Sequence, residues 1–222
     1  MNTKNFKISV LILAALAVGA WVKPMYHDVK LATQAVMERQ SIIDADAAGS
    51  ADVLSGNAGA TSAAVATVSS FVAQPDVPRN LVITPGTSTP DVGACTIVVA
   101  GLNIYGRAIT EDFAFSADAS SATTGAKAFK SVSSITFPAN CETTPFAATW
   151  SVGYGEKLGL NHCLDYAGDW VFSEIGGAYE ATRATVVADA DEVEKNTADF
   201  NGTMTGSADF LAHFIQNFRC NP

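Results

Sequence analysis

Side chains that commonly carry chemistry are sparse in this chain of 222 residues, which holds three histidines and four cysteines. The histidines are His27, His162 and His213. A serine hydrolase would place its nucleophile on a Gly-x-Ser-x-Gly elbow, and the sequence contains no such motif. His162 and Cys163 are adjacent, and adjacent strand residues point to opposite faces, so they would not form a nucleophile pair. The sequence therefore predicts a protein that is not an enzyme, with no assigned catalytic residue, cofactor or metal.

The four cysteines, Cys95, Cys141, Cys163 and Cys220, are the next candidates for chemistry. None of them forms a Cys-x-x-Cys pair, which argues against a zinc ribbon and against a redox dithiol. An even number of cysteines in a β-rich chain is compatible with two disulfides, which four cysteines can form in three ways. It is equally compatible with four buried free thiols.

Two polar segments near the C-terminus match known site motifs only in part. The first offers four carboxylates, which are ligands that Ca²⁺ prefers: Asp189, Asp191, Glu192 and Glu194. This segment lacks the glycine and the ligand spacing of an EF-hand loop, so a solvated acidic turn is the favoured interpretation. The second, Asn201-Gly202-Thr203, satisfies the Asn-x-Thr glycosylation pattern, but the pattern is short and the segment is typical of a turn.

Aromatic side chains could form a sugar-binding face, and the candidates are Trp150, Tyr154, Trp170 and Phe172. In alternating strand patterns such residues more often belong to the core, and we expect the core here. The triplet Gly153-Tyr154-Gly155 lacks the lysine and the following helix of a phosphate-binding loop. The sequence predicts a tight turn between two strands at this triplet.

Composition narrows the function classes further. The net charge is −9 at pH 7, and the 13 lysines and arginines are scattered along the chain. A protein that neutralises nucleic-acid phosphates needs a basic face, so we expect no direct binding to nucleic acid. Charged residues make up only 16% of the chain. Such a low share favours a surface that packs against other subunits.

The start of the chain differs in pattern from the rest. Residues 1–22 combine Lys4 and Lys7 with a short apolar run, as a secretory signal peptide does. The run is short for a membrane span, which needs about 20 apolar residues. If the segment is retained, it must bury itself in a membrane, in a neighbouring subunit or against its own body.

A helical arm and a linker are predicted to follow. Apolar residues recur at helical spacing from Met25 onward, which predicts an amphipathic helix that completes an arm over residues 1–47. Residues 48–63 are rich in Ala, Gly and Ser, which predicts a flexible linker and a domain boundary.

From residue 64 to residue 222 the sequence predicts one antiparallel β-sandwich domain, similar to a jelly roll. Short apolar runs rich in β-branched and aromatic residues alternate with clusters of Gly, Pro, Asn and Asp. We expect strands within residues 64–73, 79–83, 95–100, 109–115, 129–137, 147–152, 157–160, 163–166, 170–175, 179–188 and 210–219. A terminal helix is the alternative for the last of these segments.

Four motifs, in this order, resemble a module that is common among structural proteins of tailed bacteriophages. They are QPDVPRNLVITPG at 74–86, GLNIYGRAITEDFAF at 101–115, ATTGAKAFKSVSSITFPA at 122–139 and ATWSVGYGEKLGL at 148–160. A later segment, YEATRATVVADADEVEKNTADFNGTMTG at 179–206, is similar to the end of such proteins. The resemblance extends over residues 74–222.

The resemblance implies a virion component, namely a capsid-associated cement or decoration protein without catalytic residues. Its partners would be the major capsid protein or other virion subunits, and a symmetric homo-oligomer such as a trimer fits this role. Residues 1–47 would be the docking element. The signal-like start of the chain supports an alternative: an exported or membrane-anchored β-sandwich protein that binds a glycan or a protein partner. In that case residues 1–22 would contact the membrane.

Overall fold

A computed structural model describes residues 36–58, 65–86, 91–143 and 148–216. The chain divides into two compact units, Met1–Met37 and Glu38–Pro222, and nearly all described residues belong to the second unit. As the sequence predicted, the described part is mainly β, with antiparallel sheets. Short 3₁₀ helices occur in the connections: η1 (Ala139–Cys141), η2 (Ala167–Asp169) and η3 (Val193–Lys195).

Sheet C has the strand order β3-β8-β5-β6. Its strands are β3 (Ala66–Val68), β8 (Ser131–Phe137), β5 (Cys95–Leu102) and β6 (Ala108–Phe115). Alternation explains why β5 forms: Cys95, Ile97 and Val99 are buried, while the residues between them are more exposed. β5 and β6 form a hairpin whose turn is closed by a hydrogen bond from the Gly106 amide to the Asn103 carbonyl (2.9 Å).

Sheet B has the strand order β12-β13-β9-β4-β7, and β2 also pairs with β9. Its strands are β12 (Thr185–Val187), β13 (Thr197–Asp199), β9 (Thr149–Gly159), β4 (Arg79–Pro85), β7 (Thr123–Thr124) and β2 (Leu54–Ala58). β9 pairs with β2 near its start, with β13 at its end, and with β4 along most of its length. It is the strand that connects the two ends of this sheet.

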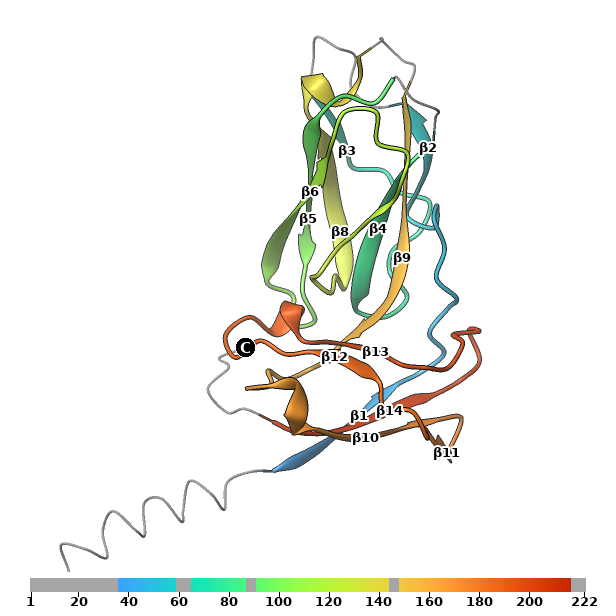
Figure 1. Ribbon diagram of the computed structural model, residues 1–222, viewed down its shortest axis with the longest axis vertical. Coiled ribbons are helices and arrows are strands. Elements are labelled where there is room, and N and C mark those ends of the chain that lie inside the picture. The colour runs from blue at the N-terminus through green and yellow to red at the C-terminus, as the bar shows by residue number, and fades with distance from the viewer. Residues whose placement is uncertain (1–35, 59–64, 87–90, 144–147, 217–222) are drawn as a thin grey trace, which may run out of the picture. The chain divides into compact units, whose positions relative to one another are not determined.

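Sheet A has the strand order β1-β14-β10-β11. Its strands are β1 (Met37–Ile42), β14 (Phe210–Ile215), β10 (Trp170–Ile175) and β11 (Ala178–Tyr179). Figure 1 shows β1, from the start of the described chain, beside β14 from its end. This sheet therefore joins segments that are far apart in the sequence.

Two separate clusters of buried side chains hold these sheets together. The first is shared by sheets B and C and includes Phe113, Phe129, Phe137 and Trp150. The second is shared by sheet A and the β12-β13-β9 end of sheet B, and includes Leu158, Trp170, Phe210 and Phe214. Burying one large apolar side chain stabilises the fold by roughly 1.5–3 kcal/mol, so each cluster is a substantial core.

The sequence was compatible with disulfides and with free thiols, and the described cysteines are disulfide-bonded. Cys95, at the start of β5, is bonded to Cys141 in η1, with Cα atoms 5.0 Å apart. Both belong to the first cluster. Cys163 is buried and disulfide-bonded as well, and its partner lies outside the described residues, as Cys220 does.

The predicted arm and linker differ from the structure where the two can be compared. Residues 37–42, expected in the helix that ends at residue 47, form strand β1, and residues 54–58 of the predicted linker form β2. In β1, Gln40 and Ile42 are buried while Arg39 and Ser41 are exposed, a period of two that pairing with β14 imposes. Residues 1–35 and 59–64 lie outside the described residues.

Three predicted local structures are wrong. Gly153-Tyr154-Gly155 is not a turn but lies inside the continuous strand β9. Residues 163–166 form no strand apart from an isolated bridge at Cys163, and η2 follows them. Only the two ends of the strand expected over residues 179–188 are strands: Tyr179 ends β11, and residues 185–187 form β12. At Gly153-Tyr154-Gly155, pairing of β9 with the distant strand β4, which the local pattern does not encode, decides the structure.

Removing the Cys95–Cys141 bond should destabilise the chain without changing its fold. The bond closes a loop with a sequence separation of 46 residues. The double variant Cys95→Ala, Cys141→Ala should therefore lose about 2–4 kcal/mol of unfolding free energy, measured by urea denaturation. Peptide mapping without reductant should recover residues 95 and 141 in one cross-linked peptide pair. Recovery of both as free thiols in freshly purified native protein would contradict the assignment.

Candidate functional site

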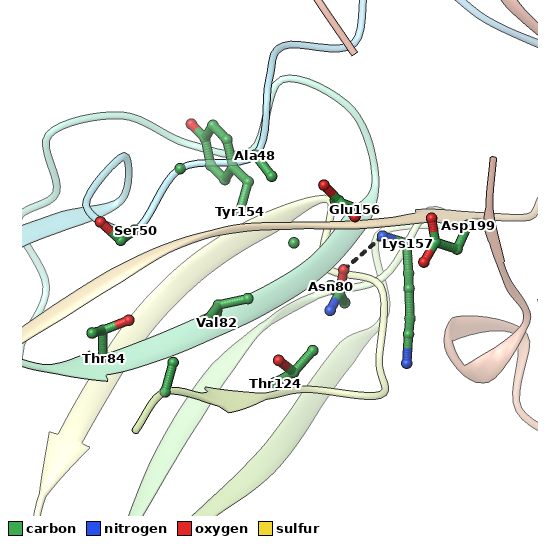
Figure 2. Close-up of a pocket in the computed structure, with 13 residues that line it drawn as sticks. Ala48, Ser50, Asn80, Val82, Thr84, Thr124, Tyr154, Glu156, Lys157 and Asp199 are labelled. Atoms are coloured by element: carbon green, nitrogen blue, oxygen red, sulfur yellow. Dashed lines mark hydrogen bonds between the residues drawn. The ribbon is translucent and has the colours of Figure 1, made fainter. Parts of the chain in front are cut away.

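A groove of about 420 Å³ lies on the face of sheet B that points away from the first cluster. β4 presents Asn80, Val82 and Thr84 to it, at alternate positions, and β7 adds Thr124, which is paired with Val82. Figure 2 shows these side chains along one side of the groove, with Ala48 and Ser50 on the other side. The groove is the candidate functional site.

The groove lies at a break in the pairing of β4 with β9. Arg79 is paired with Leu158 and Leu81 with Tyr154, so β9 carries extra residues between these positions, as in a β-bulge. Side chains of β4 replace the ladder bonds lost there. The Arg79 guanidinium donates to the Gly155 carbonyl from Nε (3.0 Å) and Nη2 (2.6 Å), and the Lys157 amide donates to Asn80 Oδ1 (2.9 Å).

Arg79 is fully buried, so its charge requires many acceptors. Besides the Gly155 carbonyl, its Nη1 donates to the Asp46 carbonyl (2.9 Å) and to Asp76 Oδ1 (3.1 Å). Its Cζ lies 5.1 Å from the centroid of the Tyr154 ring, a cation–π contact. Sequence analysis placed Arg79 at the start of a strand and missed this role. The available signal was Asp76, three residues before an arginine in an apolar strand.

Two of the three glycines of β9, Gly153 and Gly155, shape the floor of the groove. A side chain at Gly153 would collide with the backbone at Gly49 and Ser50, which therefore lies directly on the strand. A side chain at Gly155 would collide with the side chain of Asn80. Glycines inside a strand often mark such close approaches of another segment. The segment at residues 48–50 thus forms one wall because β9 has no side chains there.

One end of the groove is acidic. Glu156 and Asp199 also line an adjoining depression of about 520 Å³, which extends along residues 199–204. Burial raises the pKa of Asp199, and the neighbouring Glu156 carboxylate raises it further, while Lys157 opposes both. In Figure 2, Glu156 and Asp199 lie near each other at this end.

The lining of the groove offers hydrogen-bonding groups to a ligand. Hydroxyls of Ser50, Thr84 and Thr124 and the acidic end can exchange hydrogen bonds with a polar ligand. Neither depression is lined by a histidine or a cysteine of the described residues.

His162, His213 and Cys163 lie elsewhere in the fold. Cys163 is disulfide-bonded and has no free thiol, so it forms no nucleophile pair with His162. The His162 ring packs near the Phe214 ring, with centroids 6.4 Å apart. His213 stacks on Phe172 with ring centroids 4.0 Å apart, and His27 lies outside the described residues.

Two of the four carboxylates considered as calcium ligands, Asp189 and Glu192, are engaged within the protein. Asp189 accepts from the amides of Asp191 (2.9 Å) and Glu192 (2.8 Å), and Lys195 Nζ contacts Glu192 at 2.7 Å and Asp189 at 3.7 Å. The hydrogen bond from Lys195 lowers the pKa of Glu192. Buried Asn196 closes the segment by donating to the Asp189 and Glu192 carbonyls. The segment is therefore an acidic turn whose Asp189 and Glu192 carboxylates are bound by backbone amides and by Lys195.

The amide of Asn201 is also engaged. Its Nδ2 donates to the carbonyls of Thr182 (3.0 Å) and Arg183 (2.8 Å), and its backbone amide donates to Glu180. These bonds hold the segment between β11 and β12 against residue 201. A glycan on Nδ2 would remove at least one of its two hydrogen bonds, because a glycosylated amide keeps only one N–H.

The aromatic candidates for a sugar-binding face belong mostly to the cores. Trp150 and Tyr154 lie in the first cluster, and Trp170 lies in the second. The fourth candidate, Phe172, is only half-buried, and its ring lies between those of His213 and Tyr179. The core interpretation therefore holds for three of the four.

Comparison of the chain with protein-family models, with curated proteins and with solved structures found no match. Within the described residues, no helix is long and apolar enough to cross a membrane. The same described residues contain no group of three or more Asp, Glu, His or Cys side chains that could hold a metal ion.

Replacing Arg79 should be costly because its acceptors would stay buried. Arg79→Met removes the donor of the Gly155 and Asp46 carbonyls and one donor of the Asp76 carboxylate, which still accepts from the Asp46 amide. We expect a loss of about 3–5 kcal/mol of unfolding free energy, measured by urea denaturation. Lys130→Met, at an exposed position, is the matched control and should change stability by about 0.5 kcal/mol or less. Equal effects of the two substitutions would refute the role given to Arg79.

Asp199 should make the groove sensitive to pH. Because its pKa is raised in the folded chain, folding favours the protonated carboxyl. Its contribution to stability is therefore largest at low pH and declines as the pH rises from the unfolded pKa, about 3.9, through the folded pKa. Relative to the native chain, Asp199→Asn should gain stability across this window, by less than about 0.5 kcal/mol because solvent screens the site.

The measurement is the unfolding free energy of both proteins at several pH values. Glu156→Gln removes a carboxylate that raises the pKa of Asp199. It should therefore reduce the loss of stability that the Asp199 carboxyl causes as the pH rises. A relative stability of Asp199→Asn that falls as pH rises would show that the sign is wrong.

Proposed function

We propose that the chain is a structural virion protein, a capsid-associated cement or decoration component that stabilises a particle through contacts between subunits. Its partners would be the major capsid protein or other virion subunits. Its body would be a β-sandwich of the jelly-roll kind, and the segment before β1 would dock it onto the particle. The cluster shared by sheets B and C supports a sandwich body.

The observation that carries the proposal is the structural use of the chemistry-bearing side chains in the described residues. Three cysteines are disulfide-bonded, Arg79 completes a bulge, and the acidic turn is paired with lysines. Two buried clusters and these polar contacts stabilise the described chain, as a structural subunit needs. What remains available for function is surface, and interfaces repeated over many subunits can stabilise a shell.

The disulfides favour a second candidate function. Disulfides persist in oxidising environments and are rare in the cytosol. An exported or membrane-anchored protein that binds a glycan or a protein partner would acquire them naturally. The groove beside β4, with its hydroxyls and carboxylates, would then be the binding site.

Particle composition tests the first candidate. Virus particles from the natural source should carry this chain through a density gradient, at a fixed ratio to the most abundant shell protein. Quantitative mass spectrometry of peptides from residues 38–222 measures that ratio. A host envelope protein of similar abundance serves as the control and should separate from the particles.

The opposite result would support the second candidate. The chain would then be missing from particles and present in the envelope or the medium. Its N-terminus would begin just after Ala17 or Ala20, where the signal-like segment would be cleaved. That combination would overturn the virion proposal.

A further inference from the structure

The outer face of sheet A is apolar and aromatic, although it points away from the second cluster. Register places Phe172 opposite His213, and Glu174 opposite both Leu211 and Tyr179, so these five side chains share one face. Ile215 continues the alternation beyond His213. Tyr179 is 69% exposed and Ile215 37% exposed, while Phe172 and Leu211 are half-buried.

The opposite face of the same sheet is the one that builds the core. Ser173, Ala212 and Phe214 are buried on that side, and Ala212 and Phe214 belong to the second cluster. The outer face therefore adds apolar surface that the core does not need. Exposed apolar patches of this kind commonly mark interaction sites.

Opposite charges lie on different strands of this outer face. Arg39 on β1 is exposed, and it alternates with Gln40 and Ile42, which point inward. Among the described residues Arg39 forms no ion pair. Within the described residues, the one basic group in ion-pair range of Glu174 on β10 is His213 Nε2, at 3.8 Å, and this contact is an ion pair only when the histidine is protonated.

Strand order places these charges on either side of the apolar centre. The order is β1-β14-β10-β11, so Arg39 lies at one edge, Leu211 and His213 lie on the next strand, and Glu174 and Tyr179 lie toward the other edge. A two-fold axis parallel to the strands would set β1 of one copy across from β11 of the other. In that arrangement each Arg39 faces the acidic and aromatic side of its partner.

We propose that this outer face of sheet A binds a second copy of the chain, through an isologous interface with Phe172, Leu211, Tyr179 and Ile215 at its centre. Arg39 of each copy pairs with the region of Glu174 and Tyr179 on the other, where a carboxylate and an aromatic ring both attract a guanidinium. The inference deepens the proposed assembly function and rests on it for its biological meaning, but the contact itself is testable in isolation.

A charge exchange on the full chain tests the interface. Arg39→Glu and Glu174→Arg should each weaken dimerisation about tenfold or more, because each places like charges together. The double variant, Arg39→Glu with Glu174→Arg, should recover most of the affinity, since the pair is restored with reversed sign. Analytical ultracentrifugation in a mild non-ionic detergent gives the dissociation constants.

Two charge reversals elsewhere on the surface are the matched controls. Lys130→Glu and Asp112→Arg change net charge equally, at exposed positions outside sheet A, and should leave dimerisation unchanged. If the apolar segment at residues 1–22 drives association, all five variants will dimerise as the native chain does, and that result would overturn the proposal. A monomeric chain would do the same, as would a double variant that is weaker than either single variant.

The outcome separates this inference from the proposed function. A chain found in particles that stays monomeric in solution would refute the interface alone. A chain that dimerises through Arg39 and Glu174 but never occurs in particles would refute the virion role alone.

Discussion

The buried guanidinium of Arg79 is the interaction on which the remaining structure depends. An isolated charge in a protein interior is strongly unfavourable, and Arg79 is tolerated because carbonyl, carboxylate and aromatic partners surround it. In return it satisfies the Gly155 carbonyl where β9 departs from its pairing with β4. Without such a donor the bulge would leave a buried backbone group unpaired.

The same solution recurs further along β9. Asn80 accepts the Lys157 amide, and Gln40 donates to the Gly159 carbonyl (3.0 Å) while accepting from the Asn161 amide (2.9 Å). Side chains thus complete the hydrogen bonding wherever the strand loses a neighbouring strand. Because these side chains come from β1 and β4, the two cores are joined by polar contacts as well as by the strand itself.

The regular part of this fold was predictable from sequence, and the irregular part was not. Strands β4, β5, β6, β8, β10 and β14 carry clear alternation or long apolar runs, and the sequence identified each of them. β1 and β2 were missed because their residues resemble a helix and a linker, and only pairing with β14 and β9 makes them strands. The glycines at 153 and 155 were taken for a turn, whereas they provide room for residues 49–50 and for Asn80.

The candidate site was less predictable for a related reason. Its residues come from segments around residues 48, 80, 124, 155 and 199, which no local motif connects. Sequence reasoning concentrated instead on histidines, cysteines and clustered carboxylates, and the structure engages the described ones in packing, disulfides and ion pairs. The motifs at 74–86 and 148–160 that the sequence analysis singled out contain Arg79, Asn80 and Gly155, but they predicted no role for these residues.

Strand β9 contributes residues to both clusters, and this limits how the sequence can change in evolution. Trp150, Val152, Tyr154, Leu158 and the following Leu160 all occupy alternate positions of one run, and they supply both clusters. Inserting or deleting a single residue within β9 would turn every residue beyond it to the opposite face of the sheet. We therefore expect relatives of this chain to differ in length in their loops and to keep β9 free of gaps.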